Sequence, residues 1–279
     1  MLTPPLSCLS DDLLAYIVDH LAQIPVWTKN LYNLSLADRA FTYFCQKHIF
    51  KTLYLGYRSG SRSEIIKKMA KIQGILDDDA SIARSVRIVH LSIEHKENAW
   101  LFKHSTFVGL MKLLADSPRL PHTLRLHFCK GEIGFEDPVL VIGRLLRSFF
   151  SQSLTVLDLK CCKQASLCLF LVCPGLKEVF LDDVVAEKSY DQYPGHYYSG
   201  REPPALERLD YRGSHTVVRQ LLAPPFQAAV VSWSHLRFLT LSPHEREGIA
   251  YLQPILDAAC DTLEELRLTN LRVVWGSAG

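Results

Sequence analysis

A leucine pattern of the form Leu-x-x-Leu-x-Leu recurs through most of this 279-residue chain. Complete or nearly complete copies begin at Leu154, Leu176, Leu206, Leu236 and Leu263. Weaker copies lie at 86–91 and 120–126, and 53–55 is a candidate first copy. The last apolar residues of successive copies are 22 to 36 residues apart, mostly at or a little above the roughly 20 to 29 residues usual for leucine-rich repeats. Because alternate strand residues share a face, each copy predicts a strand with two inward leucines, which must stack on its neighbours to be buried.

The segments between these strands carry apolar residues at helical spacing, most clearly at 65–76, 107–114, 140–149 and 217–222. Strand followed by helix, repeated, predicts an α/β fold: an irregular leucine-rich-repeat solenoid, or horseshoe, over residues 53–279. A doubly wound α/β domain is the less favoured alternative, since no Gly-rich phosphate turn follows any strand.

The position three residues after the last apolar residue of each copy also bears on this prediction. Leucine-rich repeats usually place Asn or Cys there, where it satisfies the backbone of the turn. Cys129, Cys162 and Ser214 fit this pattern, whereas Val184 and His244 do not. The ladder of such residues is therefore expected to be imperfect.

Residues 1–52 lack the repeat and predict a separate module of three short helices. Ser10 supplies a helix start, and apolar residues follow it at helical spacing through Leu21. Pro25 and Trp27 mark a break, a short second segment spans 31–36, and a third helix follows Asp38. Because so small a core usually needs support from a neighbour, we expect the module to pack on the first repeat.

Three stretches of this region carry a family resemblance. The run 9–21, Leu-Ser-Asp-Asp-Leu-Leu-Ala-Tyr-Ile-Val-Asp-His-Leu, resembles the opening of an F-box. The stretch 31–41 is similar to the later L-x-x-L-S-L-V-x-R-x-F segment of that family, and 48–55 resembles its junction with leucine-rich repeats. In this order the chain resembles a fungal F-box/leucine-rich-repeat protein. It departs from the family at Ser10, where Pro is usual, and in a longer loop at 24–30.

The resemblance implies a substrate receptor of an SCF-type cullin-RING ubiquitin ligase. Such a protein binds a Skp-family adaptor, and through it a cullin, by its F-box, and binds a protein substrate by its repeats. The positions implied at the adaptor are Leu9, Ser10, Leu13, Leu14, Ile17 and Leu36. Several of these side chains could instead fill the three-helix core, and both roles stay open for Ile17 and Leu36. The alternative for the whole chain is a leucine-rich-repeat scaffold or interaction protein without a ubiquitin-ligase role.

Strand geometry predicts which repeat residues could contact a substrate. The residue between the last two leucines of each copy points away from the core, as does the residue that follows the last leucine. The first row is Arg125, Asp158, Phe180, Asp210, Thr240 and Arg267; the second is His127, Lys160, Asp182, Arg212, Ser242 and Thr269. Mixed charge around an aromatic side chain suits a protein or peptide ligand. The alternative is an ordinary solvated sheet face.

A segment at 183–204 interrupts the repeats and is rich in tyrosine, glycine and proline, with Tyr193 and Tyr197 among its aromatic residues. Long loops of this kind are often either functional or disordered. Tyrosine-rich loops form recognition surfaces at low entropic cost. We expect this insert to contribute to substrate binding, with disorder as the alternative.

Composition and motifs exclude several classes of function. A formal net charge of +2, from 31 basic and 29 acidic residues, gives no reason to expect nucleic acid or an anionic membrane as the partner. No apolar run approaches the roughly 20 residues of a membrane helix, and no secretory signal is recognisable.

Motifs of hydrolases, metalloproteases and nucleotide-binding enzymes are missing, so we predict a non-catalytic protein without cofactor or metal. None of the eight cysteines forms a C-x-x-C pair, which favours buried thiols in the cytoplasm or nucleus.

Overall fold

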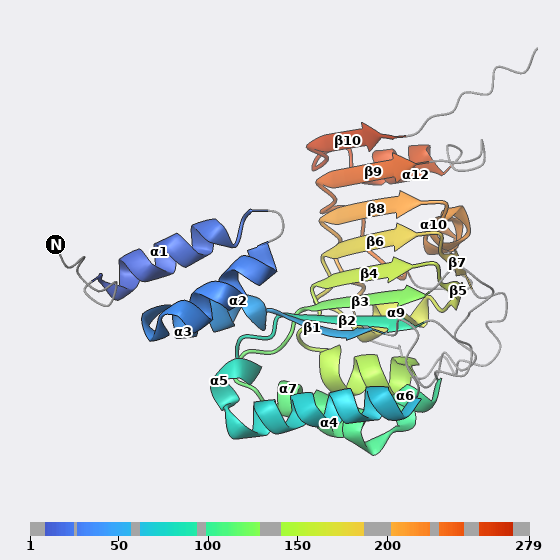
Figure 1. Cartoon of the computed structure of the whole chain (residues 1–279). Coiled ribbons are helices and arrows are strands. Elements are labelled where there is room, and N and C mark those ends of the chain that lie inside the picture. Colours follow the sequence, from blue (N-terminus) through green and yellow to red (C-terminus); the bar gives the residue numbers. More distant parts are fainter. Residues whose placement is uncertain are drawn as a thin grey trace, which may run out of the picture.

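The computed structural model describes residues 9–24, 27–56, 62–93, 99–128, 141–186, 202–223, 229–242 and 251–269. It is a mixed α/β structure built on one parallel sheet of eight strands (Figure 1). The strands are β1 (Thr52–Gly56), β2 (Ile88–Ile93), β3 (Thr123–Phe128), β4 (Val156–Lys160), β6 (Glu178–Asp182), β8 (Arg208–Arg212), β9 (Phe238–Ser242) and β10 (Glu265–Leu268). Each strand pairs with the next one in this order. The predicted α/β class is confirmed.

The strand register aligns the leucine positions of successive copies. One continuous row joins the last apolar residues, namely Leu55, Leu91, Leu126, Leu159, Leu181, Tyr211, Leu241 and Leu268. A second row, two residues earlier, runs from Leu53 to Leu266. Both rows are buried except at β10, where Leu266 and Leu268 are exposed. They lie at the edge of the sheet, because no strand follows β10 in the described part of the chain.

The turn after each middle strand also repeats. The residue directly after β4, β6 and β8 has a left-handed backbone: Cys161 (φ 52°), Asp183 (φ 55°) and Gly213 (φ 58°). The next residues, Cys162, Val184 and Ser214, are fully buried. The backbone N–H of Val184 donates to the Ser214 hydroxyl at 2.9 Å, and that hydroxyl donates to the Arg212 carbonyl at 2.9 Å.

Val184 offers no polar side chain at this position, so the ladder of such residues is imperfect there. Its own backbone N–H is satisfied by the Ser214 hydroxyl of the next repeat. Cys129 and His244 lie outside the described residues. Two short strands, β5 (Lys163–Ala165) and β7 (Val185–Ala186), pair beside this turn region.

Helices of very different length connect the strands. Below the first strands in Figure 1 lie α4 (Arg62–Asp78), α5 (Ala80–Ala83), α6 (Ala99–Lys103) and α7 (Ser105–Ala115). The others are the π-helix η3 (Val141–Phe150), α9 (Cys168–Val172), α10 (His215–Leu222) and α12 (Leu252–Ala258). The helical spacing at 65–76, 107–114 and 217–222 is confirmed, whereas 141–150 winds as a π-helix. Cys161, Cys162, Cys168 and Cys173 are buried in this core as thiols, as their apolar setting predicted.

The N-terminal helices form what we call the helical module: α1 (Asp11–Leu21), α2 (Trp27–Ala37) and α3 (Arg39–Ile49). Its buried core is separate from that of the sheet and consists of Leu14, Val18, Leu31, Phe41 and Cys45. The second helix is 11 residues long and begins four residues before the predicted segment at 31–36. The module leads directly into β1, and the Lys51 carbonyl accepts hydrogen bonds from Arg87 N–H at 2.9 Å and Ile88 N–H at 3.0 Å.

Candidate functional site

The helical module exposes large apolar side chains although its core is small. Leu13 is 43% exposed and Tyr16 69%, and they lie three residues apart on α1. Tyr32 and Leu36, four residues apart on α2, are 56% and 70% exposed. Residues three or four apart share one side of a helix. Each of these helices therefore presents an apolar side to solvent as well as one to the core.

The residues predicted to bind an adaptor divide into three groups. Leu13 and Leu36 are exposed. Leu14 is buried in the module core, so its predicted surface role is wrong, because helix phase turns it inward one residue after Leu13. Leu9 and Ile17 are half-buried and pack against that core. Ser10 is exposed and caps α1, its hydroxyl accepting from Leu13 N–H at 3.4 Å.

Sequence reasoning missed Tyr16 and Tyr32. Tyr16 follows the exposed Leu13 by three residues, and Tyr32 precedes the exposed Leu36 by four. The same helical spacing that identified the core could have found them. They enlarge the exposed apolar surface with two side chains that are common at protein interfaces.

The side of the sheet opposite the leucine rows is polar. We call it the polar face and define it by two rows in strand register. One row runs Tyr54, His90, Arg125, Asp158, Phe180, Asp210, Thr240 and Arg267; the other runs Gly56, Ser92, His127, Lys160, Asp182, Arg212, Ser242 and Thr269. Every substrate-contact residue predicted on a strand lies on this face. The sequence prediction of which residues align is confirmed, while their role in binding stays a prediction.

Ion pairs connect neighbouring strands across the polar face. Asp158 on β4 lies 3.5 Å from Arg125 Nε and 3.3 Å from His127 Nε2. The His127 nitrogen lies outside hydrogen-bonding geometry. Asp182 on β6 contacts Lys160 Nζ at 2.8 Å and Arg212 Nε at 3.9 Å. Arg125, Lys160 and Arg212 therefore balance much of the charge of the two carboxylates within the sheet.

Asp210 on β8 differs from these carboxylates. It is half-buried, and no ion pair reaches it from the described residues. Burial raises the pKa of Asp210, and the charges of Asp182 and Asp158 raise it further, against Arg208 and Arg267. Phe180 is its neighbour in register on β6. Arg267 pairs with Glu265 of its own strand.

Histidines occupy the β1–β3 end of the polar face. His90 Nε2 lies 3.1 Å from His127 Nδ1, and the Tyr54 ring meets His90 edge-on at 4.8 Å between centroids. Burial, followed by the charges of His127 and Arg125, lowers the pKa of His90 to about 4. No partner for His90 is visible in the sequence, because the pairing depends on the β2–β3 register. In the described residues no group of three His, Cys, Asp or Glu side chains is placed to bind a metal.

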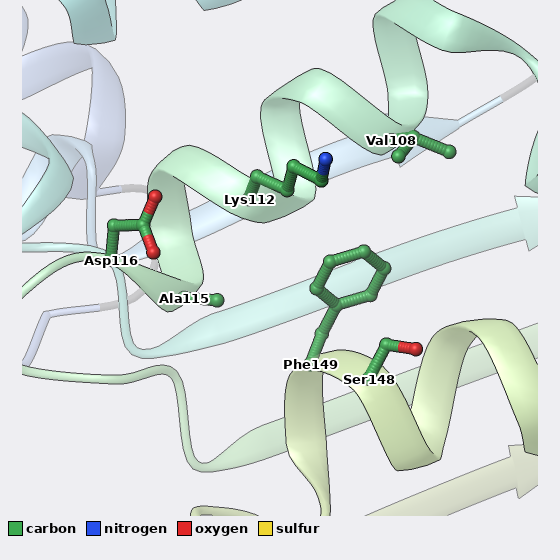
Figure 2. Close-up of a pocket in the computed structure, with 6 residues that line it drawn as sticks. All are labelled: Val108, Lys112, Ala115, Asp116, Ser148 and Phe149. Carbon is green, nitrogen blue, oxygen red and sulfur yellow. The ribbon is translucent and has the colours of Figure 1, made fainter.

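A groove of about 430 Å³ lies on the helical side of the molecule, between α7 and η3 (Figure 2). It is lined by Val108, Lys112 and Ala115 of α7, by Asp116 directly after that helix, and by Ser148 and Phe149 of η3. The Phe149 ring points from η3 towards α7. The described residues that line the groove include neither histidine nor cysteine.

A larger hollow of about 990 Å³ lies where the helical module meets the first strands. Residues of α1 and α3 line one side, and the connections into β2 and β3 line the other. Six of its lining residues are basic: Lys47, His48, Lys51, Arg84, Arg87 and Arg119. Sequence reasoning missed this site because its residues come from segments far apart in the chain. We call it the junction pocket.

Tyr193 and Tyr197, predicted to contact substrate from the 183–204 insert, lie outside the described residues. The sequence matches no protein-family model and no curated protein. Of the helices that the structure describes, none combines the length and the apolar character needed to cross a membrane.

Proposed function

We propose that this protein is the substrate-receptor subunit of an SCF-type cullin-RING ubiquitin ligase. In this proposal the helical module is an F-box that binds a Skp-family adaptor, and the sheet with its helices is a leucine-rich-repeat solenoid that binds a protein substrate. The protein itself is non-catalytic and acts in the cytoplasm or nucleus.

The exposed leucines of the helical module carry the proposal. Leu13 and Leu36 are more than two-fifths exposed, and neither belongs to the core of five buried residues in the described part of the module. A large apolar side chain gains about 1.5–3 kcal/mol when it is fully buried. Covering Leu13, Leu36 and the neighbouring tyrosines would therefore stabilise a complex with an adaptor that offers an apolar groove.

The polar face supports the substrate half of the proposal. Its rows combine charged residues with the half-buried aromatic side chain of Phe180, a mixture that suits a protein surface. Asp210 beside Phe180 offers a carboxylate without an ion pair in the described strands. A basic side chain of the substrate placed there would gain a charge-assisted contact next to an apolar one.

A pull-down with a purified Skp-family adaptor tests the proposal. We expect the wild-type chain to bind, and Leu13→Asp/Leu36→Asp to lose binding at least about a hundredfold, because two desolvated contacts are removed. Leu266→Asp/Leu268→Asp is the matched control, since it changes two leucines of comparable exposure at the far edge of the sheet. It should bind the adaptor as the wild type does, with circular dichroism showing that the helices of both variants persist.

The second candidate is a leucine-rich-repeat scaffold without a ligase role. Ser10 favours it, because it stands where the F-box family usually has Pro and serves here as the cap of α1. If the wild-type chain captured no adaptor while Ser10→Pro did, the scaffold would be the better account. If neither captured it, the exposed leucines would serve a different partner.

A further inference from the structure

The junction pocket concentrates positive charge. It is lined by Lys47, Lys51, Arg84, Arg87 and Arg119, and Asp19 is the one carboxylate among the described lining residues. The pocket thus holds five of the chain's 31 Lys and Arg residues against one of its 29 Asp and Glu residues. The chain as a whole is nearly balanced in charge, so this excess of basic residues distinguishes the pocket.

The single acidic group at the pocket does not balance this charge. Asp19 Oδ1 contacts His48 Nε2 at 2.6 Å and so is already engaged by a sixth basic residue. The cations also influence one another. Burial and the charge of Arg119 lower the pKa of Arg87, and burial, with the charges of Arg87 and Lys51, lowers the pKa of the neighbouring His122. The potential in the pocket is therefore positive.

Backbone contacts hold the cation-bearing segments in place. The Lys51 carbonyl accepts from the N–H groups of Arg87 and Ile88, which fixes the α3–β1 connection against the entry to β2. The guanidinium Nη1 of Arg87 donates to the Arg119 carbonyl at 3.3 Å, which ties in the connection between α7 and β3. These hydrogen bonds thus join three connections of the chain at the pocket.

We propose that the junction pocket binds a small anion that carries several phosphate groups, and that the bound anion holds the helical module against the first strands. A volume of about 990 Å³ is at the upper end of the range for small-ligand sites. Guanidinium groups match phosphate oxygens in a two-pronged geometry. The cations converge on one hollow from four segments, which suits a compact polyanion better than an extended acidic chain. The proposal is independent of adaptor binding.

Isothermal titration of the full chain with tripolyphosphate, in metal-free buffer at constant ionic strength, tests this site. The informative variant is Arg84→Ser/Arg119→Ser, because both side chains are exposed and their loss leaves the cores intact. The matched control is Lys67→Ser/Lys71→Ser, which removes two exposed cations of α4 outside the pocket. We expect the control to bind as the wild type does, and the arginine variant to bind at least about tenfold more weakly.

Two further probes define the ligand class. Inorganic phosphate should bind at least about tenfold more weakly than tripolyphosphate, because it engages fewer cations. A hexaglutamate peptide should also bind more weakly. Equal affinity of the wild type and the arginine variant for tripolyphosphate would overturn the site. Tighter binding of the peptide would overturn the phosphate assignment in favour of an acidic protein partner, and equal binding of inorganic phosphate would overturn the requirement for several phosphate groups.

Discussion

The helical module and the eight-stranded sheet treat their apolar side chains in opposite ways. The sheet buries its leucine rows between β1 and β9 almost completely and turns charged residues towards solvent, where they pair with one another. Among its described residues, the module buries five apolar side chains and leaves Leu13, Tyr16, Tyr32 and Leu36 exposed. A stacked sheet gains burial from every added strand, whereas three short helices cannot enclose all their apolar side chains. The module is thus the region that a partner would stabilise most.

The largest expected difference between the two regions appears when one leucine is truncated in each of them. Leu126→Ala in the buried row of β3 should lower the free energy of unfolding by about 2–5 kcal/mol, because it leaves a cavity in a close-packed core. Leu36→Ala, on the exposed side of α2, should change it by less than about 0.5 kcal/mol. Urea denaturation of both variants provides the measurement. A large loss in Leu36→Ala would mean that this side chain supports the module itself and is not available to a partner.

A smaller loss of stability is expected when the hydrogen bond between the Val184 N–H and the Ser214 hydroxyl is removed. Ser214→Ala removes the acceptor of the buried Val184 N–H, and a buried donor without a partner costs about 1–3 kcal/mol. Ser234→Ala, at an exposed hydroxyl, is the control and should stay within about 0.5 kcal/mol of the wild type. Equal denaturation midpoints for the two variants would show that the ladder contributes little to the stacking of the strands.

The smallest expected effect concerns pH and the histidines of the polar face. The folded pKa of His90 is about 4, below the roughly 6.5 of an unfolded chain, so the unfolded state binds more protons between these values. Stability should therefore fall as pH drops from about 6.5 to about 4. The side chain is partly exposed, and solvent screening limits the contribution to about 1 kcal/mol.

Denaturation curves at several pH values would measure this contribution. His90→Gln should flatten the loss of stability between pH 6.5 and 4 relative to the wild type. His235→Gln, at an exposed imidazole away from the polar face, serves as the control and should follow the wild type. A His90→Gln variant that loses stability as steeply as the wild type would show that His90 is not held neutral by its surroundings.

The sequence predicts the features of this structure that depend on interactions between residues close together in the chain. The rows of the polar face follow from the two-residue period of a strand, which is enough to align Arg125, Asp158 and Phe180 from the repeat pattern alone. Helix starts at Ser10 and Asp38 follow in the same way from capping chemistry.

The remaining features depend on contacts between distant segments. Leu13 and Leu14 are adjacent and alike in the sequence; helix phase places them on different sides of α1, and the packing of the three helices decides which side is buried. The Ser214 hydroxyl accepts a hydrogen bond from the N–H of Val184, which lies 30 residues earlier in the chain. Arg119 reaches the junction pocket because α7 returns the chain beside Arg87. None of these pairings has a periodic signature, so no local pattern predicts them.

The most direct test of the proposed function is hydrogen–deuterium exchange of the full chain with and without a Skp-family adaptor. We expect slower exchange in α1 and α2, which carry the exposed leucines, and unchanged exchange in the strands β4–β9 below the polar face, which would stay available to a substrate. No change in α1 and α2, or protection confined to the sheet, would contradict the assignment of the helical module as the adaptor-binding region.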